Sequence, residues 1–184
     1  MLAYVFWHWP MAGFEREYEE RLIPFQHALQ QAVPGGFRSS AVFRIPSVPW
    51  TASRVGGYED WYILDGSAAL DALNDAAVSA RCRTVHDTAA AAAGGGTAGL
   101  YKLRLGTGDL NTMRHATWFA KPRGISYEAL YGRIKQLVSE SDCLLWGRQM
   151  VLGPKPEFCL HTAARVELPT EFEEIPVELA RIWP

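Results

Sequence analysis

Apolar and polar residues alternate in some segments of this chain, and in others apolar residues recur every three or four positions. Alternation is typical of strands, and the longer spacing is typical of helices. The first part of the chain therefore predicts strands at 2–9, 37–45, 57–64 and 100–105, with helices at 14–32 and 67–79. Within helix 14–32, Pro24 predicts a kink or a break.

The segment between the second helix and the fourth strand is rich in alanine and glycine. Residues 89–93 predict a short helical turn, capped by Asp87 or Thr88. The glycine-rich run 94–99 lacks the Lys-Ser/Thr ending of a phosphate-binding loop, and it leads into a strand. It predicts a flexible hinge or a disordered loop.

The pattern of elements begins again after residue 110. It predicts strands at 115–120, 143–152, 158–166 and 177–183, a helix from Ser126 to about residue 140, and a residual helical turn at 171–174. The interval from Pro10 to Arg21 also equals the interval from Pro122 to Arg133. We therefore expect an α+β fold of two ferredoxin-like (βαββαβ) halves with antiparallel sheets. A single irregular α+β sheet is the alternative.

The two halves are expected to form one compact unit. Residues 1–110 would be a ferredoxin-like half with the Ala/Gly-rich insertion, and residues 111–184 an abbreviated second half. This order resembles the dimeric α+β-barrel superfamily of ferredoxin-like domains, which includes small monooxygenases, EthD-like proteins and the tandem, haem-binding chlorite dismutases. The resemblance is one of architecture and carries over no functional residue.

Composition excludes several classes of protein. The chain has 184 residues and a formal net charge of −2, with Arg and Lys dispersed, so we expect no nucleic-acid binding. No segment approaches the roughly 20 apolar residues of a membrane helix, and the apolar N-terminus is expected to be a strand and not a signal peptide. Three widely spaced cysteines without a Cys-x-x-Cys motif favour a reducing cytoplasm.

The first and third strands contain the preferred catalytic residues. Alternation places Tyr4, Phe6 and His8 on one face of the first strand, and Asp60 and Tyr62 on one face of the third. If the two strands are neighbours, Asp60 can orient His8 as a general base. A register slip of one residue would instead turn Asp60 to the other face.

Other candidates lie elsewhere in the chain. Arg44 or Arg148 could bind a substrate carboxylate, and the loop residue Trp50 could close a pocket or anchor an interface. No metal site is predicted, because there is no His-x-His, no His-Glu-x-x-His and no cluster of carboxylates. The cofactor is unknown, and haem bound through His115 or His161 is the weaker alternative.

These features predict a small-molecule binding protein or an enzyme of unknown reaction. Its pocket would lie between sheets and be lined by Tyr4, Phe6, His8, Tyr62 and Trp50. The alternative is a non-catalytic oligomerisation or interaction module with a filled barrel. A homo-oligomer is expected in either case. For the enzyme, His8→Ala is expected to abolish turnover or binding with little change in melting temperature.

Overall fold

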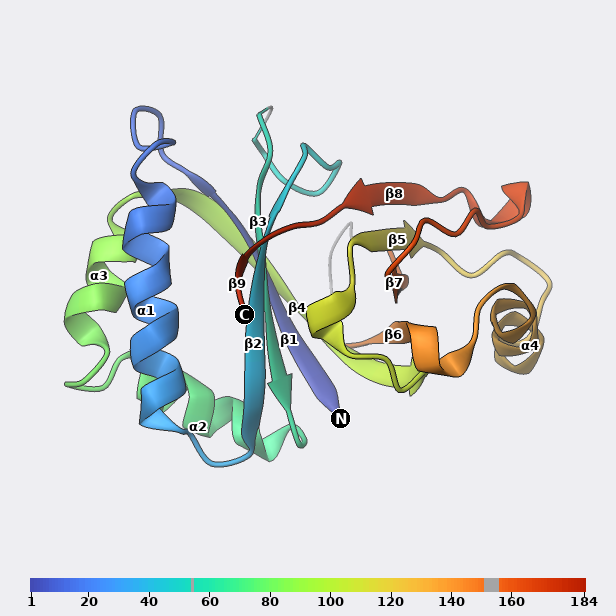
Figure 1. The fold of residues 1–184 in the computed structure, drawn as a ribbon, viewed down its shortest axis with the longest axis horizontal. Coiled ribbons are helices and arrows are strands. Elements are labelled where there is room, and N and C mark those ends of the chain that lie inside the picture. Colours follow the sequence, from blue (N-terminus) through green and yellow to red (C-terminus); the bar gives the residue numbers. More distant parts are fainter. Residues whose placement is uncertain (54, 151–155) are drawn as a thin grey trace. The chain divides into compact units, whose positions relative to one another are not determined.

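The computed structural model describes residues 1–53, 55–150 and 156–184, and its fold mixes helices with antiparallel strands (Figure 1). The chain forms two compact units. Residues 1–99 and 181–184 make the first unit, and residues 100–180 make the second. None of the described helices is both long enough and apolar enough to cross a membrane.

The first unit is a sheet with helices on one face (Figure 1). Its strands lie in the order β4-β1-β3-β2-β9, and β3 pairs antiparallel with both β1 and β2. The elements are β1 (Leu2–Pro10), α1 (Tyr18–Ala32), β2 (Phe37–Ile45), β3 (Gly57–Leu64), α2 (Ala68–Ala77), α3 (Arg83–Ala90), the first part of β4 (Ala93–Leu105) and β9 (Ala180–Trp183).

The apolar stripe of α1 packs on this sheet. Tyr18, Leu22, Phe25 and Leu29 are buried there, and they recur at spacings of three and four. The helix begins at Tyr18, four residues later than predicted, and continues through Pro24 without a break in the assigned helix. The aromatic and β-branched strand β3 is buried along its whole length, because it lies in the middle of the sheet.

The glycine-rich segment is not a flexible hinge, as the sequence suggested, but the first part of strand β4. The reason is steric. A Cβ atom on Gly96 would lie 2.5 Å from Cζ of Phe6, and one on Gly95 would lie 2.6 Å from Cζ2 of Trp9. Glycine therefore lets β4 lie beside β1 in close contact with two aromatic side chains of that strand.

The helix before β4 also differs from the prediction. The helical turn was predicted at residues 89–93, whereas α3 runs from Arg83 to Ala90. Asp87 therefore lies inside the helix and does not cap it. Its side chain instead contacts the ring of the preceding residue, His86, with 3.0 Å between Oδ1 and Nδ1.

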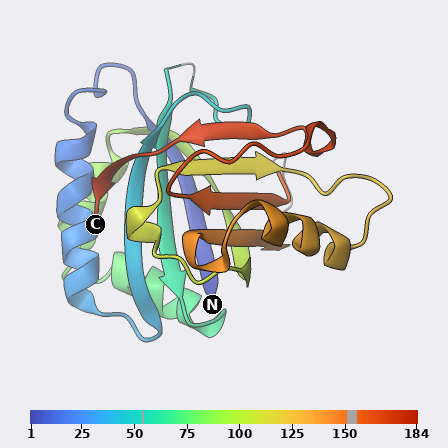
Figure 2. The same ribbon diagram turned by 45° about the vertical axis from the view of Figure 1, so that its right-hand side comes forward.

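The second unit has its own sheet, in the order β8-β5-β7-β6-β4, and its own core. Helix α4 packs on one face of that sheet (Figure 2). The remaining elements are β5 (His115–Phe119), α4 (Tyr127–Leu137), β6 (Cys143–Met150), β7 (Phe158–Thr162) and β8 (Ile175–Glu178), with 3₁₀ turns at Leu110–Thr112, Glu140–Asp142 and Thr170–Phe172.

Local predictions for this unit are largely confirmed. Ser126 caps α4, because its Oγ accepts a hydrogen bond from the backbone N–H of Ala129 at 3.1 Å. The single strand predicted at 177–183 is two strands, β8 and β9, with Leu179 between them. Residues 151–152 of the predicted strand 143–152 lie outside the described residues.

Candidate functional site

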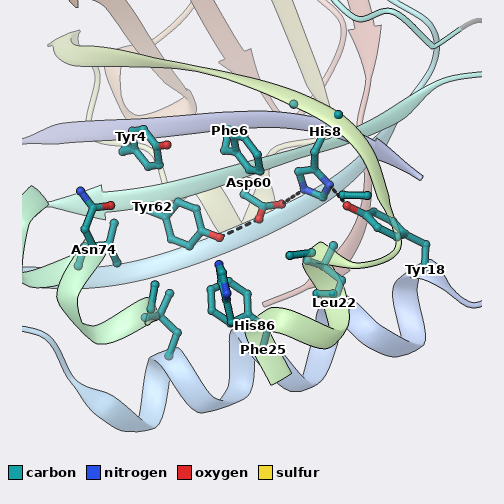
Figure 3. Close-up of a pocket in the computed structure, with 18 residues that line it drawn as sticks. Tyr4, Phe6, His8, Tyr18, Leu22, Phe25, Asp60, Tyr62, Asn74 and His86 are labelled. Atoms are coloured by element: carbon teal, nitrogen blue, oxygen red, sulfur yellow. Dashed lines mark hydrogen bonds and ion pairs between the residues drawn. The ribbon is translucent and has the colours of Figure 1, made fainter. Parts of the chain in front are cut away.

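A cavity of about 410 Å³ lies within the first unit, between its sheet and helices α1, α2 and α3 (Figure 3). From the sheet it is lined by Tyr4, Phe6, His8, Asp60, Tyr62 and Gly96, among others. From the helices it is lined by Tyr18, Leu22, Phe25, Leu73, Asn74 and His86, among others. The sequence placed the pocket between sheets, whereas this cavity lies between a sheet and its helices.

Strand geometry brings the sheet residues to this cavity. Phe6 is the register partner of Asp60, and His8 is the partner of Tyr58. Since side chains alternate along a strand, Tyr4, Phe6 and His8 face the same side as Asp60 and Tyr62. The slip that would have turned Asp60 away is absent from the described pairing of β1 with β3.

His8 is hydrogen-bonded through both ring nitrogens. Its Nε2 lies 2.9 Å from Oδ1 of Asp60, and its Nδ1 lies 2.7 Å from the hydroxyl of Tyr18 (Figure 3). A carboxylate can only accept, so in the neutral imidazole that keeps both bonds Nε2 donates to Asp60 and Nδ1 accepts from Tyr18. The predicted approach of His8 to Asp60 is therefore present, while Tyr18 was not anticipated as its second partner.

Asp60 is held by further donors. Its Oδ2 accepts hydrogen bonds from the Tyr62 hydroxyl at 2.8 Å and from Nε2 of Gln26 at 3.0 Å. Gln26 in turn accepts from Ser40 at 3.0 Å, and Ser40 accepts from the indole of Trp183 at 3.1 Å. A buried carboxylate needs such partners, because burial without them is strongly unfavourable.

The tyrosines around Asp60 remain protonated. Burial, and then the charge of Asp60, raises the pKa of Tyr18, Tyr62 and Tyr4 above the ordinary value of tyrosine. Their hydroxyl groups are therefore hydrogen-bond donors, and a free phenolate at Tyr18 is strongly disfavoured.

The ring of His8 is packed between aromatic rings. Phe6 and Tyr58 stack on it, with centroid distances of 5.1 Å and 5.6 Å. The Tyr58 hydroxyl points elsewhere and donates to Glu19 at 3.0 Å. Glu19 also accepts a hydrogen bond from Nε of Arg44 at 2.7 Å. The pKa of Glu19 is lowered, and this hydrogen bond is the largest cause. Arg44 thus lies outside the cavity and is paired with a carboxylate.

Two further predicted ligand-binding residues also lie outside the cavity. Trp50 is buried, and its ring meets the edge of Trp7, 6.2 Å away, on the sheet face opposite His8. Arg148 belongs to the second unit, where it lies beside Arg104 and Glu157 around a separate small depression. Of the eight predicted site residues, the cavity is lined by the five on β1 and β3: Tyr4, Phe6, His8, Asp60 and Tyr62.

The histidines considered for haem or metal are in the second unit. Burial lowers the pKa of His161 to about 3, so this ring is neutral. His115 is half-buried on β5. Within the described residues, no three or more His, Cys, Asp or Glu side chains gather in a way that could hold a metal ion.

Sequence reasoning missed the residues that the helices contribute. Tyr18, Phe25 and Gln26 lie in the predicted helix 14–32, but none of them was predicted to belong to the site. A polar residue inside an apolar stripe was the available signal, because Gln26 lies four positions after Leu22. His86 had no comparable signal, since its approach to the cavity depends on how α3 packs.

The opposite face of β3 holds a second buried carboxyl, that of Glu59. Its two oxygens accept indole N–H groups from Trp7 and Trp61, each at 3.0 Å. Burial outweighs these bonds and raises the pKa of Glu59 to about 7. Between the unfolded value of 4.5 and this folded value, only the folded state holds the proton.

Stability should therefore fall as pH rises from about 5 to about 8, by on the order of 2–3 kcal/mol from Glu59 alone. Glu59→Gln should remove this part of the decline, as measured by denaturant unfolding at both pH values. Glu20→Gln, at an exposed position, is the matched control, and its unfolding free energy should decline with pH as in the wild-type protein. An unchanged slope in Glu59→Gln would contradict the assignment.

Comparison with known proteins shows similarity of structure alone. No protein-family model and no curated protein matches the chain. A crystal structure described as a putative monooxygenase from Fusobacterium nucleatum aligns with 98% of this chain and 91% of its own, with a TM-score of 0.63 and 11% identity. An anthrone oxidase-like protein aligns with 98% of this chain and 91% of its own, with a TM-score of 0.60 and 10% identity.

Two further structures align over a similar extent. A protein described as a putative monooxygenase from Lactobacillus acidophilus aligns with 98% of this chain and 93% of its own, with a TM-score of 0.58 and 9% identity. A structure described as a putative chlorite dismutase aligns with 98% of this chain and 94% of its own, with a TM-score of 0.53 and 8% identity. At such low identity the likeness establishes the fold and not the reaction. The chain therefore shares the mixed α+β fold of these proteins.

Proposed function

We propose that this protein is an enzyme that removes a proton from a small, flat, largely apolar ligand bound in the cavity of the first unit. The observation that supports this most directly is the position of His8. It lies between the Tyr18 hydroxyl and the Asp60 carboxylate, in the wall of a cavity large enough for a small molecule.

The proton would move through Tyr18. Its oxygen would accept the proton of the ligand while its own proton passes to Nδ1 of His8. The products are a ligand anion, a neutral tyrosine and an imidazolium paired with Asp60. The transfers would be concerted, because the raised pKa of Tyr18 disfavours a free phenolate.

The lining favours a ligand that is neutral before it reacts. No Lys or Arg is found among the described lining residues, and Asp60 already places a carboxylate there. Arg44 is paired with Glu19 outside the cavity. A carboxylate ligand would therefore meet repulsion from Asp60 and no Lys or Arg to bind it, whereas a phenol or a ketone could hydrogen-bond to the tyrosines and stack on Phe6.

The names of the similar structures agree with small-molecule chemistry. They include proteins described as monooxygenases and an anthrone oxidase-like protein. The proposal for this chain is confined to the proton transfer, for which its own residues supply the groups.

We also propose that residues 1–110 and 111–184 are two related ferredoxin-like halves. Both contain the order strand, helix, strand, strand: β1-α1-β2-β3 in the first and β5-α4-β6-β7 in the second. In the second, a 3₁₀ turn stands where the second helix would be.

A spectroscopic titration tests the proton transfer. 4-Nitrophenol and 4-nitro-1-naphthol are suitable probes, because each changes colour on ionisation. At a pH where the free probe is mostly neutral, the bound probe should be largely ionised, and the melting temperature should rise with its concentration. The matched carboxylate, 1-naphthoate, should produce little shift. A protein that binds neither phenol, or binds both in the neutral form, would contradict the proposal.

A further inference from the structure

His86 faces the same cavity as His8, but from the helices. It lies on α3, and Figure 3 shows its ring on the side of the cavity across from the strand residues Phe6 and His8. Its orientation is fixed by Phe25, whose ring it meets edge-on at 5.4 Å, and by Asp87, which lies 3.0 Å from Nδ1. Nε2 forms no hydrogen bond with any described residue, so it is available to a ligand.

Charge balance gives this histidine a distinct part in the reaction. Removing a proton from a neutral ligand leaves an anion in a cavity that is mostly apolar. An anion in such surroundings is stabilised only by a nearby positive charge or by hydrogen-bond donors. The imidazolium formed at His8 is not sufficient to stabilise the ligand anion, because its charge is balanced by Asp60, whose Oδ1 lies 2.9 Å from Nε2.

The described lining offers no other source of positive charge. It contains neither Lys nor Arg, and its remaining polar side chains are tyrosines, one asparagine and one carboxylate, besides the two histidines. Histidine can carry a positive charge near neutral pH. Asp87 is an exposed carboxylate placed to support that charge from the outer side of the ring.

We propose that His86 is a second catalytic residue, which donates a hydrogen bond from its charged ring to the anion formed when Tyr18 and His8 take the proton. This inference rests on the proposed function and deepens it. It makes the site a pair of opposed groups: the base formed by Tyr18 of α1 and His8 of β1, and an electrophile, His86, on α3. The substrate class that fits is a flat, enolisable ketone, because its proton leaves a carbon beside Tyr18 while its developing oxyanion points toward α3. In the probe 4-nitrophenol, the negative charge of the ionised form is shared with the nitro oxygens, which would point toward α3. Asp87 would be a positioning residue.

His86→Gln is the direct test. The change should lower the ratio of ionised to neutral bound 4-nitrophenol at least about tenfold, the effect of removing one opposite charge close to an ionisable group. Asp87→Asn should lower the ratio in the same direction by a smaller factor. The His86 side chain is 35% exposed, so its variant should fold and bind the neutral phenol.

His27→Gln is the matched control, since His27 is an exposed histidine of α1 that does not line the cavity. It should leave the ratio unchanged. If His86→Gln keeps the wild-type ratio while Tyr18→Phe abolishes ionisation, only the role of His86 is overturned. If the wild-type protein binds the phenol in its neutral form, both the proposed function and this inference are overturned.

Discussion

Replacing His8 with alanine should lower the free energy of unfolding by about 3 kcal/mol or more, in addition to abolishing ionisation of the bound phenol. His8 is 1% exposed, and its Nε2 is a partner of the buried carboxylate of Asp60. Alanine would leave one oxygen of that carboxylate without its donor and Tyr18 without its acceptor. The sequence alone suggested little change in melting temperature, and the burial of His8 changes this expectation.

The measurement is denaturant unfolding, with thermal unfolding beside it. A loss of 3 kcal/mol corresponds to a drop of roughly 6–12 °C for a chain of this size. His8→Gln is the matched variant, because its amide can still donate toward Asp60, and it should recover part of the stability without recovering ionisation. If His8→Ala has the melting temperature of the wild-type protein, the buried His8–Asp60 pair does not contribute to stability, and the assigned hydrogen-bond network is wrong.

Removal of one oxygen atom from Tyr18 should have the largest effect on catalysis. Tyr18→Phe keeps the ring that packs in the core but removes the hydroxyl that lies 2.7 Å from Nδ1 of His8. The rate at which a bound enolisable ketone exchanges its α-proton with solvent should fall about 10²–10⁴-fold, the usual contribution of a positioned proton-transfer group. The loss of stability should be only about 1 kcal/mol, the net value of one hydrogen bond.

Tyr58→Phe is the matched control for that experiment. Tyr58 also stacks on His8, but its hydroxyl donates to Glu19 and not to the imidazole. Its removal should therefore leave ionisation of the bound phenol near the wild-type level. Equal losses of activity in the two variants would indicate that packing around His8 is responsible, and the proton path through Tyr18 would be rejected.

The buried network supports the Asp60 carboxylate in the absence of a ligand. Asp60 accepts hydrogen bonds from Tyr62 and Gln26, and Gln26 is tied through Ser40 to Trp183 near the end of the chain. Residues from β1, β2, β3, α1 and β9 thus hold one carboxylate in place. Such support keeps a proton-transfer group in its productive geometry without a rearrangement during the reaction.

Local sequence patterns were enough to place most strands and one face of the site. The strands at 37–45 and 57–64 have the predicted bounds, and alternation brought Tyr4, Phe6 and His8 to the face that they occupy. The period of two is a property of the strand backbone, so it needs no knowledge of the rest of the fold. The pairing of β1 with β3 then brings Asp60 to His8.

What packs on that face depended on contacts between segments far apart in the chain. Alternation cannot distinguish a face that meets helices from one that meets another sheet, so the cavity between the sheet and α1–α3 was not foreseen. Tyr18, Gln26 and His86 reach it only because of how α1 and α3 pack. The local sequence of the β4 glycines likewise predicted a flexible loop, since nothing in it shows that the side chains of Phe6 and Trp9 lie against them.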